Sequence, residues 1–64
     1  MIDKYLNVLV NKIDERITQI QETLGDGQAT DYSEYRAMVG EIKGLLTARL
    51  NTKDLLKTFE ESDD

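Results

Sequence analysis

The sequence predicts an all-α protein: an antiparallel two-helix hairpin that is completed by oligomerisation or by a partner. Three observations predict this fold. Apolar residues recur at helical spacing over residues 2–24. A glycine-containing connection of about six residues follows, and a loop this short places neighbouring helices antiparallel. A second helical pattern then runs over residues 31–60.

The first predicted helix spans about residues 2–24 and carries a narrow apolar seam. Its apolar residues are spaced 4-3-4-4-3-4 and fall within roughly 80° of the helix circumference. The pattern repeats after eleven residues, which favours straight or slightly right-handed packing over a left-handed heptad coil. The residues of this predicted seam are Ile2, Leu6, Leu9, Ile13, Ile17, Ile20 and Leu24.

The connection between the helices contains signals for a helix end and a helix start. Gly25 follows the last periodic leucine directly. We therefore expect it to be the left-handed residue that ends the first helix, since glycine has no Cβ to clash there. Asp31 is expected to cap the second helix, with Glu34 three residues later as its capping-box partner.

The second helix is expected to begin at Tyr32 and to reach at least Leu50. Heptad steps carry its apolar face further, to Leu56 and Phe59, provided the helix is continuous. Residues 51–52 (Asn-Thr) favour helix ends over helix interiors, so a break there is the alternative. The large residues of this face are Tyr35, Met38, Val39, Ile42, Leu45 and Leu46.

Small residues line the opposite side of the second helix, within about 80° of one another. Each glycine in the middle of a helix costs about 1 kcal/mol relative to alanine, so two on one face need a reason. Close approach of another helix is one reason, and it would make this side a second contact surface. The alternative is a solvent-exposed side without a partner. The residues are Ser33, Ala37, Gly40, Gly44, Ala48 and Asn51.

The C-terminal turns of the second helix are expected to overhang the first helix. At 1.5 Å per residue the first helix is about 35 Å long and the second about 45 Å. A hairpin of this size buries little surface, and such scaffolds usually need a partner. We therefore predict that protein interaction uses Ala37, Gly40, Gly44, Ala48, Leu55, Leu56 and Phe59.

Composition argues against an enzyme and against a metal or cofactor site. The chain has 64 residues with no Cys and no His, so the usual zinc ligands and the usual catalytic base and nucleophile are missing. We expect no catalytic residue, no cofactor, no metal and no small-molecule substrate. No apolar stretch is long enough to span a membrane, which predicts a soluble intracellular chain.

Charge divides the chain into a near-neutral body and an acidic tail. Four of the thirteen acidic residues lie within residues 60–64, which leaves nine acidic against eight basic residues in the helical hairpin of residues 1–59. Nucleic-acid binding is not expected, because it needs a concentrated basic face. The tail is expected either to dock on a basic partner or to be a solubilising, frayed terminus.

The second helix resembles a family of short, acidic-tailed proteins of tailed bacteriophages, often encoded near head and packaging genes. The likeness covers about half of the chain: residues 31–45 (DYSEYRAMVGEIKGL), Ala48, and the Asp54-Leu55-Leu56 stretch with its acidic ending. The sequence departs from the family at Thr52, where an aliphatic residue is expected. This departure bears on helix continuity at that position.

The resemblance implies a bacteriophage context and a role in virion assembly. The first hypothesis is a non-enzymatic structural or assembly protein that associates with itself or with a capsid, portal or packaging component. The alternative is a small regulatory protein that binds and modulates a host enzyme through residues 60–64. Either role places the chain in the cytoplasm of an infected bacterial host, and the first also allows incorporation in the virion.

Overall fold

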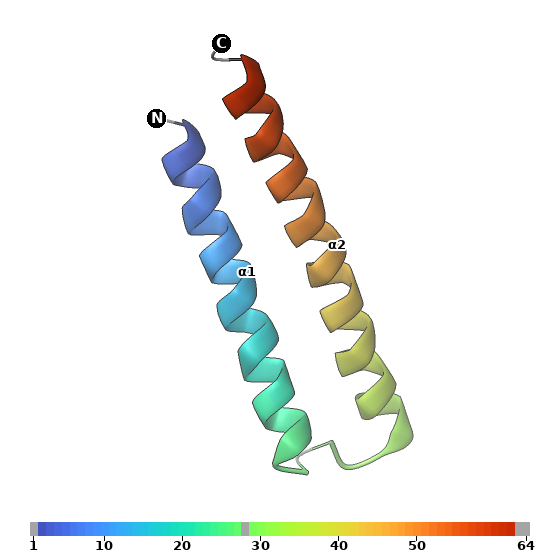
Figure 1. The fold of residues 1–64 in the computed structure, drawn as a ribbon. Helices are drawn as coiled ribbons and strands as arrows, with labels where there is room; N and C mark the ends of the chain where they lie inside the picture. The colour runs from blue at the N-terminus through green and yellow to red at the C-terminus, as the bar shows by residue number, and fades with distance from the viewer. Residues whose placement is uncertain (1, 28, 63–64) are drawn as a thin grey trace.

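The chain folds into two long helices that lie side by side (Figure 1). The structure, a computed structural model, describes residues 2–27 and 29–62. Helix α1 spans Ile2–Gly25 and helix α2 spans Tyr32–Ser62. The N-terminal end of α1 lies beside the C-terminal end of α2, so the helices are antiparallel. The predicted all-α hairpin is confirmed.

Helix α2 runs through Asn51 and Thr52 without a break. The Thr52 hydroxyl donates a hydrogen bond to the Ala48 carbonyl oxygen at 2.8 Å, so its polar group is satisfied inside the helix. The helix is therefore continuous across residues 51–52, as expected, and the alternative of a break there is wrong. The helix also takes in residues 60–62 of the predicted acidic tail, whereas residues 63–64 lie outside the described residues.

The glycine that ends α1 is not the predicted one. Gly25 is the last residue of the helix, and Gly27 adopts the left-handed conformation, with φ +71°. The Asp26 N–H donates to the Glu22 carbonyl at 2.9 Å, and the Gly27 N–H donates to the Leu24 carbonyl at 3.2 Å. These bonds extend the helical turn past Gly25. The left-handed residue that ends the turn is therefore Gly27, two residues later than expected.

The start of α2 is capped largely as predicted. The Glu34 N–H donates to Asp31 Oδ1 at 2.8 Å, which confirms Asp31 as the N-cap. The Glu34 carboxylate reaches one residue further back than a capping box does. It accepts the Thr30 N–H and the Thr30 hydroxyl, each at 2.8 Å. These two donors lower the pKa of Glu34.

Helix α1 packs on α2 through a seam with heptad spacing. Val10, Ile13, Ile17 and Ile20 are buried. Leu6 and Leu24 are half-buried at the two ends, so the spacing is 4-3-4-3-4. The predicted eleven-residue repeat is wrong for this helix: it placed Leu9 in the seam, whereas Leu9 is exposed and Val10 takes the position.

The seam of α2 mirrors that of α1, with spacing 4-3-4-3-4-3. Its residues, all buried or half-buried, are Met38, Ile42, Leu45, Arg49, Thr52, Leu56 and Phe59. Because the two series run in opposite directions with the same spacing, each of the six seam residues of α1 matches one of the first six of α2, and Phe59 has no counterpart among them. Aligning the two series in antiparallel order matches Leu56 with Leu6 and Thr52 with Val10. Tyr35 and Leu46, expected on the apolar face, are half exposed instead.

The mirrored seam also changes the predicted overhang. Leu56 was expected to lie beyond the cover of α1, but it is buried. Phe59 is half-buried and Leu55 is exposed. The helices differ in length as expected, with 24 residues in α1 and 31 in α2. Since Leu56 already falls opposite Leu6, only the last turn of α2 extends past the start of α1.

Candidate helix–helix interface

An ion pair between the helices marks one flank of the seam. Arg16 Nε donates to Glu41 Oε2 at 2.6 Å, and Arg16 Nη2 donates to Glu41 Oε1 at 3.1 Å. Each residue directly precedes a seam residue of its own helix, so both lie on the same flank. Arg16 lowers the pKa of Glu41 through this hydrogen bond and through its charge, and Glu41 raises the pKa of Arg16 in turn.

Toward the chain termini the same flank becomes apolar. Residues seven apart share nearly the same side of a helix. Heptad steps from Arg16 reach Leu9 and Ile2, and heptad steps from Glu41 reach Ala48 and Leu55. We call Ile2, Leu9, Ala48 and Leu55 the apolar flank. All four residues are exposed, and the three large ones keep between 44% and 49% of their surface accessible.

The predicted small residues lie on the outer side of α2, next to the apolar flank. Ala37, Gly40, Gly44 and Ala48 are all exposed. A Cβ added at Gly40 or at Gly44 would meet no atom within 4 Å outside its own helix. Helix α1 therefore does not require either glycine. Within the hairpin this surface faces open space.

The predicted interaction residues near the C-terminus separate into two groups. Leu55 lies on the apolar flank and is exposed. Leu56 and Phe59 belong to the seam, where α1 covers the first of them. The structure thus places Ala48 and Leu55 on one accessible flank, and it places Leu56 inside the hairpin.

Sequence reasoning missed the contribution of α1 to this surface. Ile2 and Leu9 were expected to face α2, yet both are exposed on the apolar flank. The signal that identifies them is Val10, an apolar residue next to Leu9 that restores an unbroken heptad series. Choosing between these two neighbours requires matching the seams of both helices.

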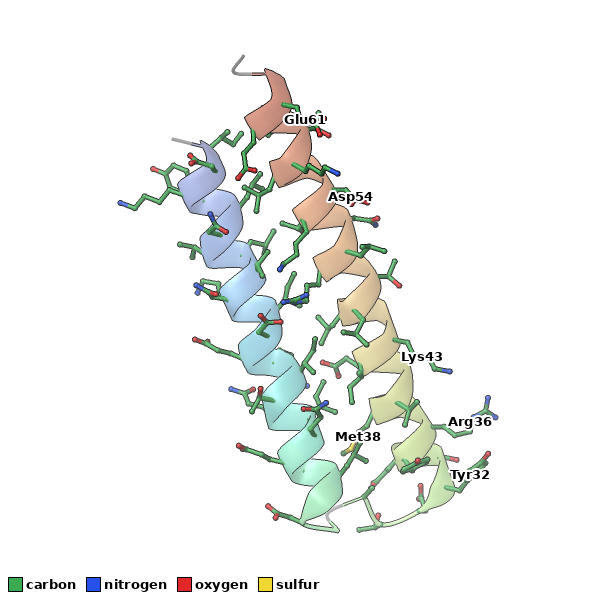
Figure 2. All side chains as sticks on the ribbon, viewed as in Figure 1. Tyr32, Arg36, Met38, Lys43, Asp54 and Glu61 are labelled. Carbon is green, nitrogen blue, oxygen red and sulfur yellow. The ribbon has the colours of Figure 1, made fainter. Side chains whose placement is uncertain are left out.

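The remaining sides of α2 are mixed in character. Figure 2 shows Met38 between the helices and Arg36 and Lys43 on the side that faces away from α1. The Arg36 guanidinium lies over the Tyr32 ring, 5.8 Å from its centroid. Two exposed leucines, Leu46 and Leu50, lie on the flank opposite to the apolar flank, because they follow seam residues rather than precede them.

A shallow, open depression lies on the polar surface of α1. It lies on one side of a single helix, and amide, hydroxyl and carboxylate groups line it: Asn11, Asp14, Glu15, Thr18, Gln19 and Glu22. Among residues 2–27 and 29–62, no group of three or more His, Cys, Asp or Glu side chains is placed to hold a metal ion. Neither helix, over its described length, is apolar enough to cross a membrane.

The arrangement is therefore one of surfaces rather than of a pocket. The hairpin presents an apolar flank built by both helices, and next to it an outer side of α2 with small residues. Comparison of the chain with protein-family models, curated proteins and solved structures found no match.

Proposed function

We propose that the chain is a non-enzymatic structural or assembly protein that acts through helix–helix association, with itself or with another component of an assembly. One observation carries the proposal. The outer side of α2 keeps Gly40 and Gly44 where α1 does not need them, at about 1 kcal/mol of helix stability each. Close approach of a further helix would compensate for that cost.

The bacteriophage setting of this proposal rests on the resemblance of residues 31–45 to the phage family. Within that setting the partners are copies of the chain or a capsid, portal or packaging component. The place of action is the cytoplasm of an infected bacterial host, or the particle itself. A helical surface with exposed leucines suits this role better than the shallow depression on α1 suits a substrate.

The test is to look for the chain in purified particles and to block the small-residue side. We expect mass spectrometry of particle proteins to detect the wild-type chain. Gly44→Leu should lower its amount at least about tenfold, since a leucine would hold another helix away. Lys43→Leu is the matched control, because it adds the same side chain one residue away, about 100° around α2 from Gly44 and off the line of small residues. Equal incorporation of both variants and the wild type would contradict the proposal.

The alternative, a regulator that binds a host enzyme, is favoured by one feature of α2. Glu60 and Glu61 lie in the last turns of the helix, and the last turn contains no basic residue. Carboxylates near a helix C-terminus are unfavourable because of the helix dipole, so their presence suggests a basic partner. Deletion of residues 60–64 should then weaken capture of that enzyme, most strongly at low salt. Capture at wild-type strength would rule out a role for this segment.

A further inference from the structure

We infer that a second copy of this chain covers the apolar flank and forms a dimer of two hairpins. This inference rests on the proposed function and deepens it, because it names the first partner and the surface that receives it. The surface is the line of Ile2 and Leu9 on α1 and Ala48 and Leu55 on α2, which continues the Arg16–Glu41 pair toward the termini.

The width of the apolar surface indicates a bundle rather than an isolated pair of helices. A two-stranded coiled coil needs two apolar positions per heptad and usually has charged residues on both flanks. Helices inside a bundle have a third apolar position per heptad, on one flank. Here both helices have it on the same flank: Ile2 and Leu9 on α1, and Ala48 and Leu55 on α2. A second pair of helices is the structure that this pattern fits.

The exposed area agrees with one interface per chain. The hairpin exposes 5044 Å² and measures 51 × 15 × 12 Å. A compact monomer of 7.3 kDa exposes roughly 4,200 Å². The excess over the whole elongated hairpin, about 850 Å², is large enough to supply the roughly 800 Å² that each partner buries in a standard stable interface. The radius of gyration is 15.0 Å, against about 11 Å for a compact chain of this length.

The charges on this flank favour a copy of the chain over a strongly charged partner. Arg16 and Glu41 neutralise one another through two hydrogen bonds, and the apolar flank itself carries no charge. Two such faces can meet without net repulsion, as an isologous two-fold interface requires. A strongly acidic or basic partner would find no unpaired opposite charge along these residues.

The test is the native mass of the full chain by light scattering across a hundredfold dilution, with matched variants. We expect the wild type to have twice the 7.3 kDa chain mass at the highest concentration. Leu55→Glu should weaken dimerisation at least about tenfold, as burial of an unpaired charge at an interface does. Its control is Leu46→Glu. Leu46 is 50% exposed against 46% for Leu55, but it lies on the other flank.

A second pair of variants guards against loss of folding. Leu9→Ala removes apolar surface without adding charge, and alanine favours the helix. It should weaken the dimer at least about threefold while the helical circular dichroism of the hairpin is retained. Val8→Ala is its control, since Val8 is 46% exposed against 44% for Leu9 and points away from the apolar flank.

Each outcome decides the inference. A dimer that both flank variants weaken and both controls leave within about twofold of wild type supports it. A monomeric wild type at every concentration overturns it, as does a dimer that the controls weaken as much as the flank variants. If the chain is monomeric but is still found in purified particles, the dimer is ruled out and the proposed assembly function is not.

Discussion

Arg49 Nε donates a hydrogen bond of 2.6 Å to Asp14 Oδ1, which links the middle of α2 to the middle of α1. Arg49 is a seam residue, and its counterpart in α1 is Ile13, directly before Asp14. The pair favours this register of the hairpin over registers shifted by a heptad. A slip of one heptad would place Arg49 beside Asn7 or Gln21 instead of a carboxylate. Polar seam residues commonly specify register in this way, at a cost in stability.

Because a polar residue in the seam costs stability, we expect Arg49→Leu to stabilise the hairpin. A leucine at this position would add apolar burial to the seam, and the partly exposed Asp14 would return to water without a large penalty. We expect the free energy of unfolding to rise by about 1 kcal/mol, measured by urea denaturation. Arg36→Leu is the control and should change it little, because Arg36 lies on the exposed surface and loses only its contact with the exposed Tyr32 ring. A lower free energy of unfolding for Arg49→Leu would mean that the Arg49–Asp14 ion pair stabilises the hairpin more than burial of a leucine in the seam does.

Thr52→Val tests the other polar residue of the seam. Thr52 is buried, and its hydroxyl bonds only within its own helix, to the Ala48 carbonyl. That carbonyl keeps its helical N–H partner when the hydroxyl is replaced by a methyl group. We expect the free energy of unfolding to rise by about 0.5–1 kcal/mol in the same urea experiment. Thr47→Val is the control, since Thr47 makes the same hydrogen bond on the exposed side. An equal gain in both variants would point to helix propensity instead of burial.

The two glycines at the end of α1 should respond in opposite directions to alanine. Gly27 has φ +71°, a conformation that costs a residue with a Cβ about 1 kcal/mol. Gly25 is helical, and a Cβ there would meet nothing within 4 Å. Gly27→Ala should therefore lower the melting temperature by several degrees, and Gly25→Ala should raise it slightly. Losses of the same size in both variants would contradict the assignment of the left-handed residue.

Acid should destabilise the hairpin through two carboxylates. The pKa of Glu34 lies below its ordinary value of 4.5 because Thr30 donates two hydrogen bonds to it, and the pKa of Glu41 is lowered by Arg16. A carboxyl group whose pKa is lower in the folded state stabilises the fold above its unfolded pKa. That contribution is lost as the pH falls through the folded pKa. We expect the melting temperature to fall as the pH drops below 4.5.

The double variant Glu34→Gln/Glu41→Gln provides the control for this acid dependence. Neither glutamine titrates, so the melting temperature of the variant should fall less steeply over the same pH range. Thermal melts followed by circular dichroism would measure both slopes. Equal slopes for the wild type and the double variant would assign the acid sensitivity to other carboxylates.

Local signals in the sequence predicted most of the fold. Apolar spacing identified both helices, and Asp31 was recognised as the N-cap from its residue type and position. The exact seam was not predictable in the same way. Leu9 and Val10 are both apolar neighbours, and only the match to Thr52 and Leu56 across the hairpin selects Val10. In α2, by contrast, heptad steps from Ile42 through the polar residues Arg49 and Thr52 predicted the seam as far as Leu56 and Phe59, and the structure has all of these residues buried or half-buried.

The candidate interface was predictable only in part, for a related reason. Ala48 and Leu55 were identified from α2 alone, and both are exposed on the apolar flank. Ile2 and Leu9 were assigned to the seam, so the half of the surface built by α1 was missed. Leu56 was misplaced because helix lengths do not determine register. A surface that two helices share emerges only when their relative rotation is known.

Gly44→Ala separates the stability of the hairpin from its association. A Cβ at Gly44 would meet open space in the hairpin, and alanine is favoured over glycine in a helix by about 1 kcal/mol. The free energy of unfolding of dilute, unassociated chain should therefore rise by about that amount. If a further helix approaches Gly44 closely in the assembly, the same methyl group should weaken association. Gly40→Ala extends the test one turn along α2. More stable chains that assemble as well as wild type would show that the glycines serve neither the fold nor a close contact.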